Sequence, residues 1–245
     1  MVIFRAMTKA PVIRPEKSKV SSDDEVAGFL NKVKTMAPVA TKTGDKQGRL
    51  IFALDATMSR EATWDHAQHI QSGMFAEAAR IGGLDVQLVY FRGFNECRSS
   101  KWVKDPNALA RLMTKVDCRG GHTQIGKVLS HIKRENTKAK VDAVVYVGDC
   151  MEENIDQLCK SAGEIGLLKV PVFMFQEGHD MQATTAFKEI ARLTGGAHCR
   201  FSSGSADQLR QLLRAVAVYA AGGRAALAKH ALNNTQGSLL LEQLR

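Results

Sequence analysis

Five oxygen-bearing side chains occur at three separate places in the sequence and could bind a divalent cation together. Asp55, Thr57 and Ser59 alternate within one short segment, Thr123 follows a glycine pair, and Asp149 follows a second apolar segment. Carboxylates and hydroxyls are the hard donors that Mg²⁺ and similar ions prefer. The set therefore predicts a site for Mg²⁺, with Mn²⁺ or Ca²⁺ as alternatives.

The number of carboxylates indicates binding rather than catalysis. Only Asp55 and Asp149 would bring formal negative charge to the cation. If the three hydroxyls bind directly and the aspartates bind partly through water, the ion stays electrophilic and accepts one more carboxylate from outside. We therefore expect a protein that captures an acidic residue of a protein partner through its metal, with no catalytic residues and no small-molecule cofactor.

Strands followed by aspartate would position these donors. Leu50–Leu54 is a continuous apolar run before Asp55, and Val141–Val147 is a second run shortly before Asp149. Runs of this kind are typical of buried central strands. In an open parallel sheet, ligands bind beyond the carboxyl ends of the strands. The two aspartates should therefore lie close together at one edge.

The rest of the chain alternates between strand and helix patterns. We expect further strands at 85–91, 170–175 and 197–201, a short edge strand within 95–103, and helices at 67–81, 106–115, 124–134, 154–165, 181–193 and 205–219. Such alternation predicts an α/β fold with a single doubly wound, mostly parallel central sheet, helices on both faces, and one short antiparallel edge strand.

Taken together, these motifs resemble the von Willebrand factor A (VWA) domain with its metal-ion-dependent adhesion site, especially small bacterial stand-alone A-domain proteins. The resemblance covers about residues 49–223. The family pattern is Asp-x-Ser-x-Ser, a distant Thr and a later Asp, and its counterparts here are Asp55, Thr57, Ser59, Thr123 and Asp149. Thr57 keeps the hydroxyl of the usual Ser, whereas Cys150 stands where Gly is common.

Residues beside these donors are expected to form a rim that contacts the partner. We assign His122, Met58 and Glu152 to this rim. Simpler roles stay open, because His122 could be an ordinary loop residue and Glu152 could begin a helix. We interpret Cys118 and Cys150 as small packing residues.

Two other functions are consistent with parts of the sequence. A haloacid-dehalogenase-like, Mg²⁺-dependent phosphatase would use Asp55 as its nucleophile, but Thr57 replaces the acid that this chemistry needs two residues later. A nucleic-acid-associated scaffold would use the basic N-terminal segment, because residues 1–49 carry +5 of the net charge of +9. Nucleic acid is therefore a possible partner, though the sequence does not require one.

Composition bounds the remaining regions and the compartment. We predict a disordered basic arm at 1–20, a short helix and linker at 21–48, and a C-terminal helical tail at 224–245. No apolar run approaches the roughly 20 residues of a membrane span, so we expect no membrane association. Five cysteines without a Cys-x-x-Cys pair favour reduced thiols and a cytoplasmic protein.

Overall fold

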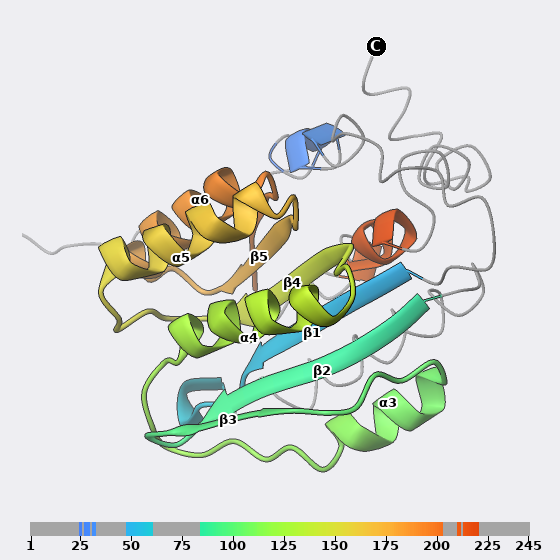
Figure 1. Cartoon of the computed structure of the whole chain (residues 1–245). Coiled ribbons are helices and arrows are strands. Elements are labelled where there is room, and N and C mark those ends of the chain that lie inside the picture. The colour runs from blue at the N-terminus through green and yellow to red at the C-terminus, as the bar shows by residue number, and fades with distance from the viewer. Residues whose placement is uncertain are drawn as a thin grey trace, which may run out of the picture.

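Six strands form one sheet in the computed structural model, which describes residues 25–32 (except 26 and 30), 48–60, 84–202 and 210–220 (except 212). The strands are β1 (Gly48–Asp55), β2 (Leu84–Arg92), β3 (Glu96–Ser99), β4 (Ala143–Gly148), β5 (Val172–Glu177) and β6 (His198–Phe201). Their order across the sheet is β3-β2-β1-β4-β5-β6 (Figure 1). Every neighbouring pair is parallel except β2 and β3, so β3 is the antiparallel edge strand of the described sheet.

Helices connect the strands. They are α3 (Pro106–Met113), α4 (Ile125–Lys138), α5 (Ile155–Leu167) and α6 (Met181–Thr194), with the short 3₁₀ helix η1 (Met58–Arg60) after β1. The described parts of 25–32 and 210–220 are also helical. Asp105, Asn154 and Asp180 cap three of the helices by accepting hydrogen bonds from first-turn backbone amides, as such side chains favour helix starts.

The sheet separates two apolar cores, because successive strand residues point to opposite faces. In β1, Leu50, Phe52 and Leu54 lie in one core together with residues of α3 and of the helical segment 213–220. Ile51 and Ala53 lie in the other, with residues of α4, α5 and α6, which lie side by side over that face in Figure 1. The predicted α/β fold, with helices on both faces of a mostly parallel sheet, is confirmed.

Some predicted boundaries shift by a few residues. The strand expected from Val170 begins at Val172, because Pro171 has no N–H to donate to a neighbouring strand. The helix expected to end at Arg134 continues to Lys138. This extra turn carries Glu135, whose carboxylate is bound by Lys138 within the same turn.

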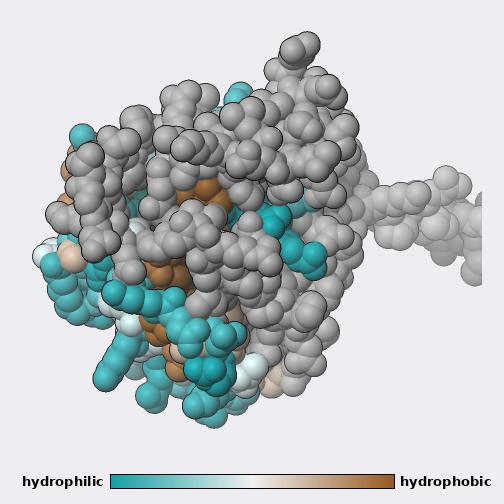
Figure 2. Space-filling model, turned by 90° about the vertical axis from the view of Figure 1, so that its right-hand side faces the viewer, coloured by the Kyte–Doolittle hydropathy of each residue, from teal (hydrophilic) through white to brown (hydrophobic). Residues whose placement is uncertain are grey.

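Several predictions fall outside the described residues. These are the helix at 67–81, the arm at 1–20, the tail at 224–245 and most of the short helix and linker at 21–48, of which only residues within 25–32 and Gly48 are described. Among the described helices, none combines the length and apolar character needed to cross a membrane. In the view of Figure 2, the described residues that reach the surface are mainly hydrophilic, with smaller apolar areas among them.

Candidate metal centre

Asp55 ends the central strand β1 and has no solvent exposure. One carboxylate oxygen, Oδ1, accepts a hydrogen bond of 2.8 Å from the backbone amide of Thr57. The other, Oδ2, is buried and has no hydrogen-bond partner among the described residues. Because burying an unpartnered charged oxygen is costly, this atom is suited to accept a ligand.

The surroundings of Asp55 favour its protonated form in the metal-free protein. Burial is the main cause, and it raises the pKa of this carboxyl from 3.8 to about 6. Hydrogen bonds from Thr57 act in the opposite direction, while the nearby carboxylate of Asp149 raises the pKa further. A bound cation would offset both the burial of the Asp55 carboxylate and its repulsion by Asp149.

Asp149 and Cys150 complete a close group with Asp55. They follow β4, which pairs directly with β1. One ligand atom from each of the three residues, two carboxylate oxygens and the sulfur, lies within 4.8 Å of the others. Asp149 Oδ1 is also buried without a hydrogen-bond partner among the described residues. Burial, and then the two carboxylates, raise the pKa of the Cys150 thiol.

The hydroxyls of Thr57 and Ser59 lie together beside Asp55. Their oxygens are 3.0 Å apart, and the hydroxyl hydrogen bond between them joins the two side chains. Thr57 is buried, whereas Ser59 is exposed. The alternate spacing of 55, 57 and 59 therefore brings these three side chains to one side of the loop after β1, as the sequence predicts.

Thr123 is bound to the loop that carries Asp149. Its amide donates to Glu152 Oε2 at 3.0 Å, and its Oγ1 accepts from the Glu152 amide at 3.0 Å. His122 lies beside this pair, with its Nδ1 3.1 Å from Glu152 Oε2. The predicted residues Thr123, His122 and Glu152 are thus brought together by two loops that are far apart in the sequence.

Glu153 joins the same two loops at the start of α4. Its carboxylate accepts hydrogen bonds from the backbone amides of Ile125 and Gly126. These amides have no partner within the helix, and the side chain of Gln124 does not cap them. Glu153 therefore acts as the cap of a helix that is distant in sequence.

The loop before Thr123 passes close to the turn between β2 and β3. The amide of His122 donates to the Gly93 carbonyl at 3.3 Å, and the Gln124 side chain donates to the same carbonyl at 3.1 Å. A Cβ on Gly121 would lie 2.0 Å from the Gly93 carbonyl oxygen. Glycine is therefore required at 121 by this approach of two backbones.

Arg60 and Glu177 hold the loop after β1, and sequence reasoning missed both. The Arg60 side chain is fully buried, with its Nη2 3.0 Å from Glu177 Oε2 at the end of β5. Its Nη1 donates to the backbone carbonyl of Asp55 at 3.0 Å. The available signal was Glu177 itself, a charged residue that follows an apolar strand at the same edge of the sheet.

Two exposed apolar side chains lie near these loops. Met58, a predicted rim residue, is 49% exposed. Phe94, which the sequence analysis did not single out, is 77% exposed, and its ring contacts His122 edge to face with centroids 5.3 Å apart. Phe94 lies in the turn after β2, where an isolated aromatic residue gives no recognisable pattern.

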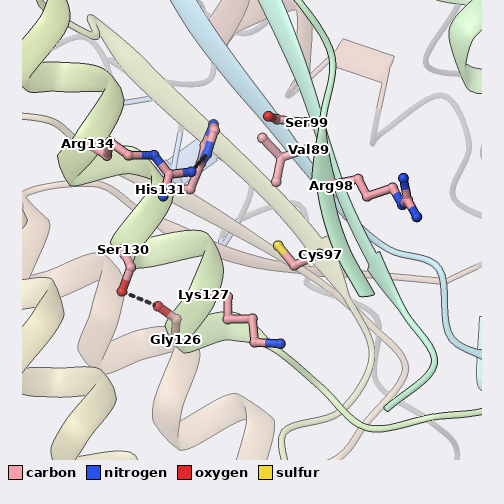
Figure 3. A pocket seen from close by; sticks show the side chains of 9 residues that line it. All are labelled: Val89, Cys97, Arg98, Ser99, Gly126, Lys127, Ser130, His131 and Arg134. Atoms are coloured by element: carbon pink, nitrogen blue, oxygen red, sulfur yellow. Dashed lines mark hydrogen bonds between the residues drawn. The ribbon is translucent and has the colours of Figure 1, made fainter. Parts of the chain in front are cut away.

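A separate cavity of about 340 Å³ lies between β3 and α4. Its lining includes Arg98, Lys127 and Arg134, with the Cys97 thiol facing α4 across it (Figure 3). None of the described residues that line this cavity carries a carboxylate, so the cavity is poorly suited to a cation. The cluster of Asp55, Asp149 and Cys150 fits a divalent cation better, because it offers two unpartnered buried oxygens.

Comparisons with known proteins identify the fold. No protein-family model matches the sequence, and no curated protein is significantly similar to it. Among solved structures, a von Willebrand factor type A protein from Catenulispora acidiphila aligns with a TM-score of 0.60 at 14% identity, over 71% of this chain and 43% of that one. This chain thus spans less than half of that protein.

Two further structures agree. The SpRpn10 VWA domain aligns with a TM-score of 0.56 at 11% identity, over 67% of this chain and 95% of that one. Proximal thread matrix protein 1 from the mussel byssus, with a zinc-occupied adhesion motif, aligns with a TM-score of 0.58 at 14% identity, over 70% and 46%. The chain therefore has a VWA-type fold, and its carboxylate cluster lies at the carboxyl ends of the central strands.

Proposed function

We propose that this protein is a metal-dependent binding module that captures an acidic side chain of a protein partner and has no enzymatic activity. The observation that carries the proposal is the buried, unpartnered pair of oxygens, Asp55 Oδ2 and Asp149 Oδ1. A divalent cation held there would supply an open coordination position for a carboxylate from outside. The solved adhesion motif that contains zinc supports a metal at this place in the fold.

Each predicted residue has a defined part in this proposal. Asp55 and Asp149 supply negative charge, while the hydroxyls of Thr57, Ser59 and Thr123 supply neutral oxygen donors. These five oxygen donors, taken alone, favour Mg²⁺ or Mn²⁺. Because three of the five donors are neutral hydroxyls, the two carboxylates only balance the charge of a divalent cation. The cation can therefore accept a further anion.

The exposed side chains around the cluster would contact the partner. Met58 and Phe94 are both highly exposed and apolar. His122 packs against Phe94 and is bound to Glu152. Apolar side chains next to a metal-bound carboxylate would add contact area that excludes water. The preferred partner segment is therefore an acidic residue flanked by apolar residues.

Displacement of metal-bound water tests this proposal. Mn²⁺ bound to the protein should keep an exchangeable water, which speeds the relaxation of solvent protons. A short blocked peptide with one glutamate beside a leucine should displace that water and lower the relaxation enhancement, whereas the glutamine counterpart should not. Equal responses to the two peptides, or no response to either at millimolar concentration, would contradict carboxylate capture.

A further inference from the structure

The residue after Asp149 distinguishes this cluster from an all-oxygen site. Cys150 is half-buried, and its sulfur lies within 4.8 Å of carboxylate oxygens from both Asp55 and Asp149. Asp55, Asp149 and Cys150 are thus a group of potential metal ligands, found among the described residues, whose ligand atoms lie close together. The thiol therefore faces the same space as the two carboxylates.

The two carboxylates are suited to bind a cation at this point. Asp55 is fully buried, and its Oδ2 has no hydrogen-bond partner among the described residues. The charged side chain with the larger effect on Asp55 is Asp149. Asp149 is another carboxylate, so it cannot compensate the charge of Asp55. Arg60 binds the backbone carbonyl of Asp55 and the carboxylate of Glu177, and its charge lowers the pKa of Asp55 less than the charge of Asp149 raises it. A cation between the two carboxylates and the sulfur would satisfy all three groups.

The distances allow the three atoms to share one ion. Zinc binds carboxylate oxygen at about 2.0 Å and thiolate sulfur at about 2.3 Å, so donors around one tetrahedral ion lie about 3.5 Å apart. Atoms within 4.8 Å of one another reach that spacing through small side-chain rotations. Asp149 and Cys150 are adjacent in the loop after β4, and Asp55 ends the neighbouring strand β1, so the three donors come from two segments at one edge of the sheet.

We propose that Cys150 is a ligand of the metal in this site, and that its sulfur shifts the preference of the site from Mg²⁺ to Zn²⁺. This inference rests on the metal site of the proposed function but does not depend on carboxylate capture. On binding, a sulfur–metal bond forms, the S–H bond breaks, and the proton leaves to solvent. Thiolate favours borderline and soft ions, whereas Mg²⁺ and Mn²⁺ prefer oxygen. In this proposal Cys150 is a selectivity residue, a role that differs from the packing role expected from the sequence.

Cobalt provides the direct test, because Co²⁺ substitutes for Zn²⁺ and gives a near-ultraviolet charge-transfer band when it binds thiolate. Wild-type protein, kept reduced with a phosphine, should show this band on titration with Co²⁺, and Zn²⁺ should abolish it by displacement. C150S should lose the band and bind Zn²⁺ at least about tenfold more weakly. Its affinity for Mn²⁺ should change by less than about threefold, since serine keeps an oxygen donor.

Two control variants separate the possible failures. C118S alters another half-buried thiol and should keep the band. D55A should lose both Co²⁺ and Mn²⁺ binding; if it binds both normally, the metal site itself is wrong. If wild type and C150S bind Co²⁺ in the same Asp55-dependent way without a thiolate band, the sulfur ligand is wrong while the oxygen site stands.

Discussion

Two buried carboxylates at opposite ends of the sheet, Glu135 and Asp55, have contrasting surroundings. Glu135 accepts hydrogen bonds from Trp102 Nε1 at 2.8 Å and Lys138 Nζ at 2.6 Å, and it lies 3.6 Å from Arg49 near the start of β1. Asp55, at the other end of β1, has one oxygen without a hydrogen-bond partner among the described residues. The Glu135 carboxylate is therefore compensated by its partners, whereas one oxygen of the Asp55 carboxylate is left without any among the described residues.

The pKa values of the two groups express this contrast. Burial raises the pKa of Glu135, but hydrogen bonds from Lys138 and Trp102 outweigh it and leave the pKa below its ordinary value. At Asp55, burial dominates and the pKa rises to about 6. The two carboxylates therefore differ in their partners rather than in their burial.

The largest effect is expected at the compensated carboxylate, Glu135. E135A should lower the free energy of unfolding by about 3 kcal/mol, because it leaves the partly buried Trp102 N–H without its acceptor and removes the carboxylate that pairs with Arg49. Denaturant unfolding measures this loss. Metal binding should be unchanged, since Glu135 lies at the other end of the sheet; a variant that unfolds normally but loses metal would contradict the separation of the two ends.

A glycine pair beside Thr123 allows a matched comparison at the site end. G121A should cost about 2 kcal/mol and weaken metal binding, because the new Cβ would collide with the Gly93 backbone. G120A is the control, since nothing lies within 4 Å of a Cβ at that position. Its stability should change by less than about 0.5 kcal/mol. Equal effects of the two substitutions would show that this loop does not need the close approach.

Replacing the Asp55 carboxylate should change the free energy of unfolding in the opposite direction from E135A. D55N removes a buried charge and keeps a side chain of similar shape, so the metal-free protein should gain about 1 kcal/mol of stability at neutral pH. Thermal unfolding in chelator measures the change. A large loss of stability would mean that the Asp55 carboxylate is a structural group whose partners outweigh its burial.

The pH dependence of stability should separate the two carboxylates by sign. The pKa of Asp55 is raised on folding, so its contribution is fully present below about pH 4 and is lost as pH rises through about 6 in the metal-free protein. The pKa of Glu135 is lowered, so its contribution is present above 4.5 and is lost as pH falls. Between pH 4 and 6, D55N should therefore make stability rise more steeply with pH. Below pH 4.5, E135Q should make stability rise less steeply with pH.

The fold and part of the site could be predicted from the sequence because both depend on local patterns. Apolar runs define β1 and β4, and the residues that follow them must meet at one edge of a parallel sheet. The spacing of 55, 57 and 59 likewise predicts that these side chains converge. Assignment of the five oxygen donors as metal ligands stays a prediction until metal binding is measured.

Other parts of the site depend on tertiary contacts that leave no local pattern. The ion pair of Arg60 with Glu177 joins residues 117 positions apart. Glu153 caps α4 from another loop, which a search for Ser, Thr, Asp or Asn immediately before the helix cannot find. The position of Cys150 beside both carboxylates depends on the conformation of the loop after β4. Each of these features can be recognised only from the three-dimensional structure.

Metal-dependent stabilisation of the wild type and of D55N tests the central claim most directly. Mn²⁺ at about one hundred times its dissociation constant should raise the free energy of unfolding of the wild type by about 2.7 kcal/mol. D55N should show no increase, although it is the more stable of the two in chelator. An equal increase in both proteins would contradict the assignment of Asp55 and the unpartnered oxygens to a metal site.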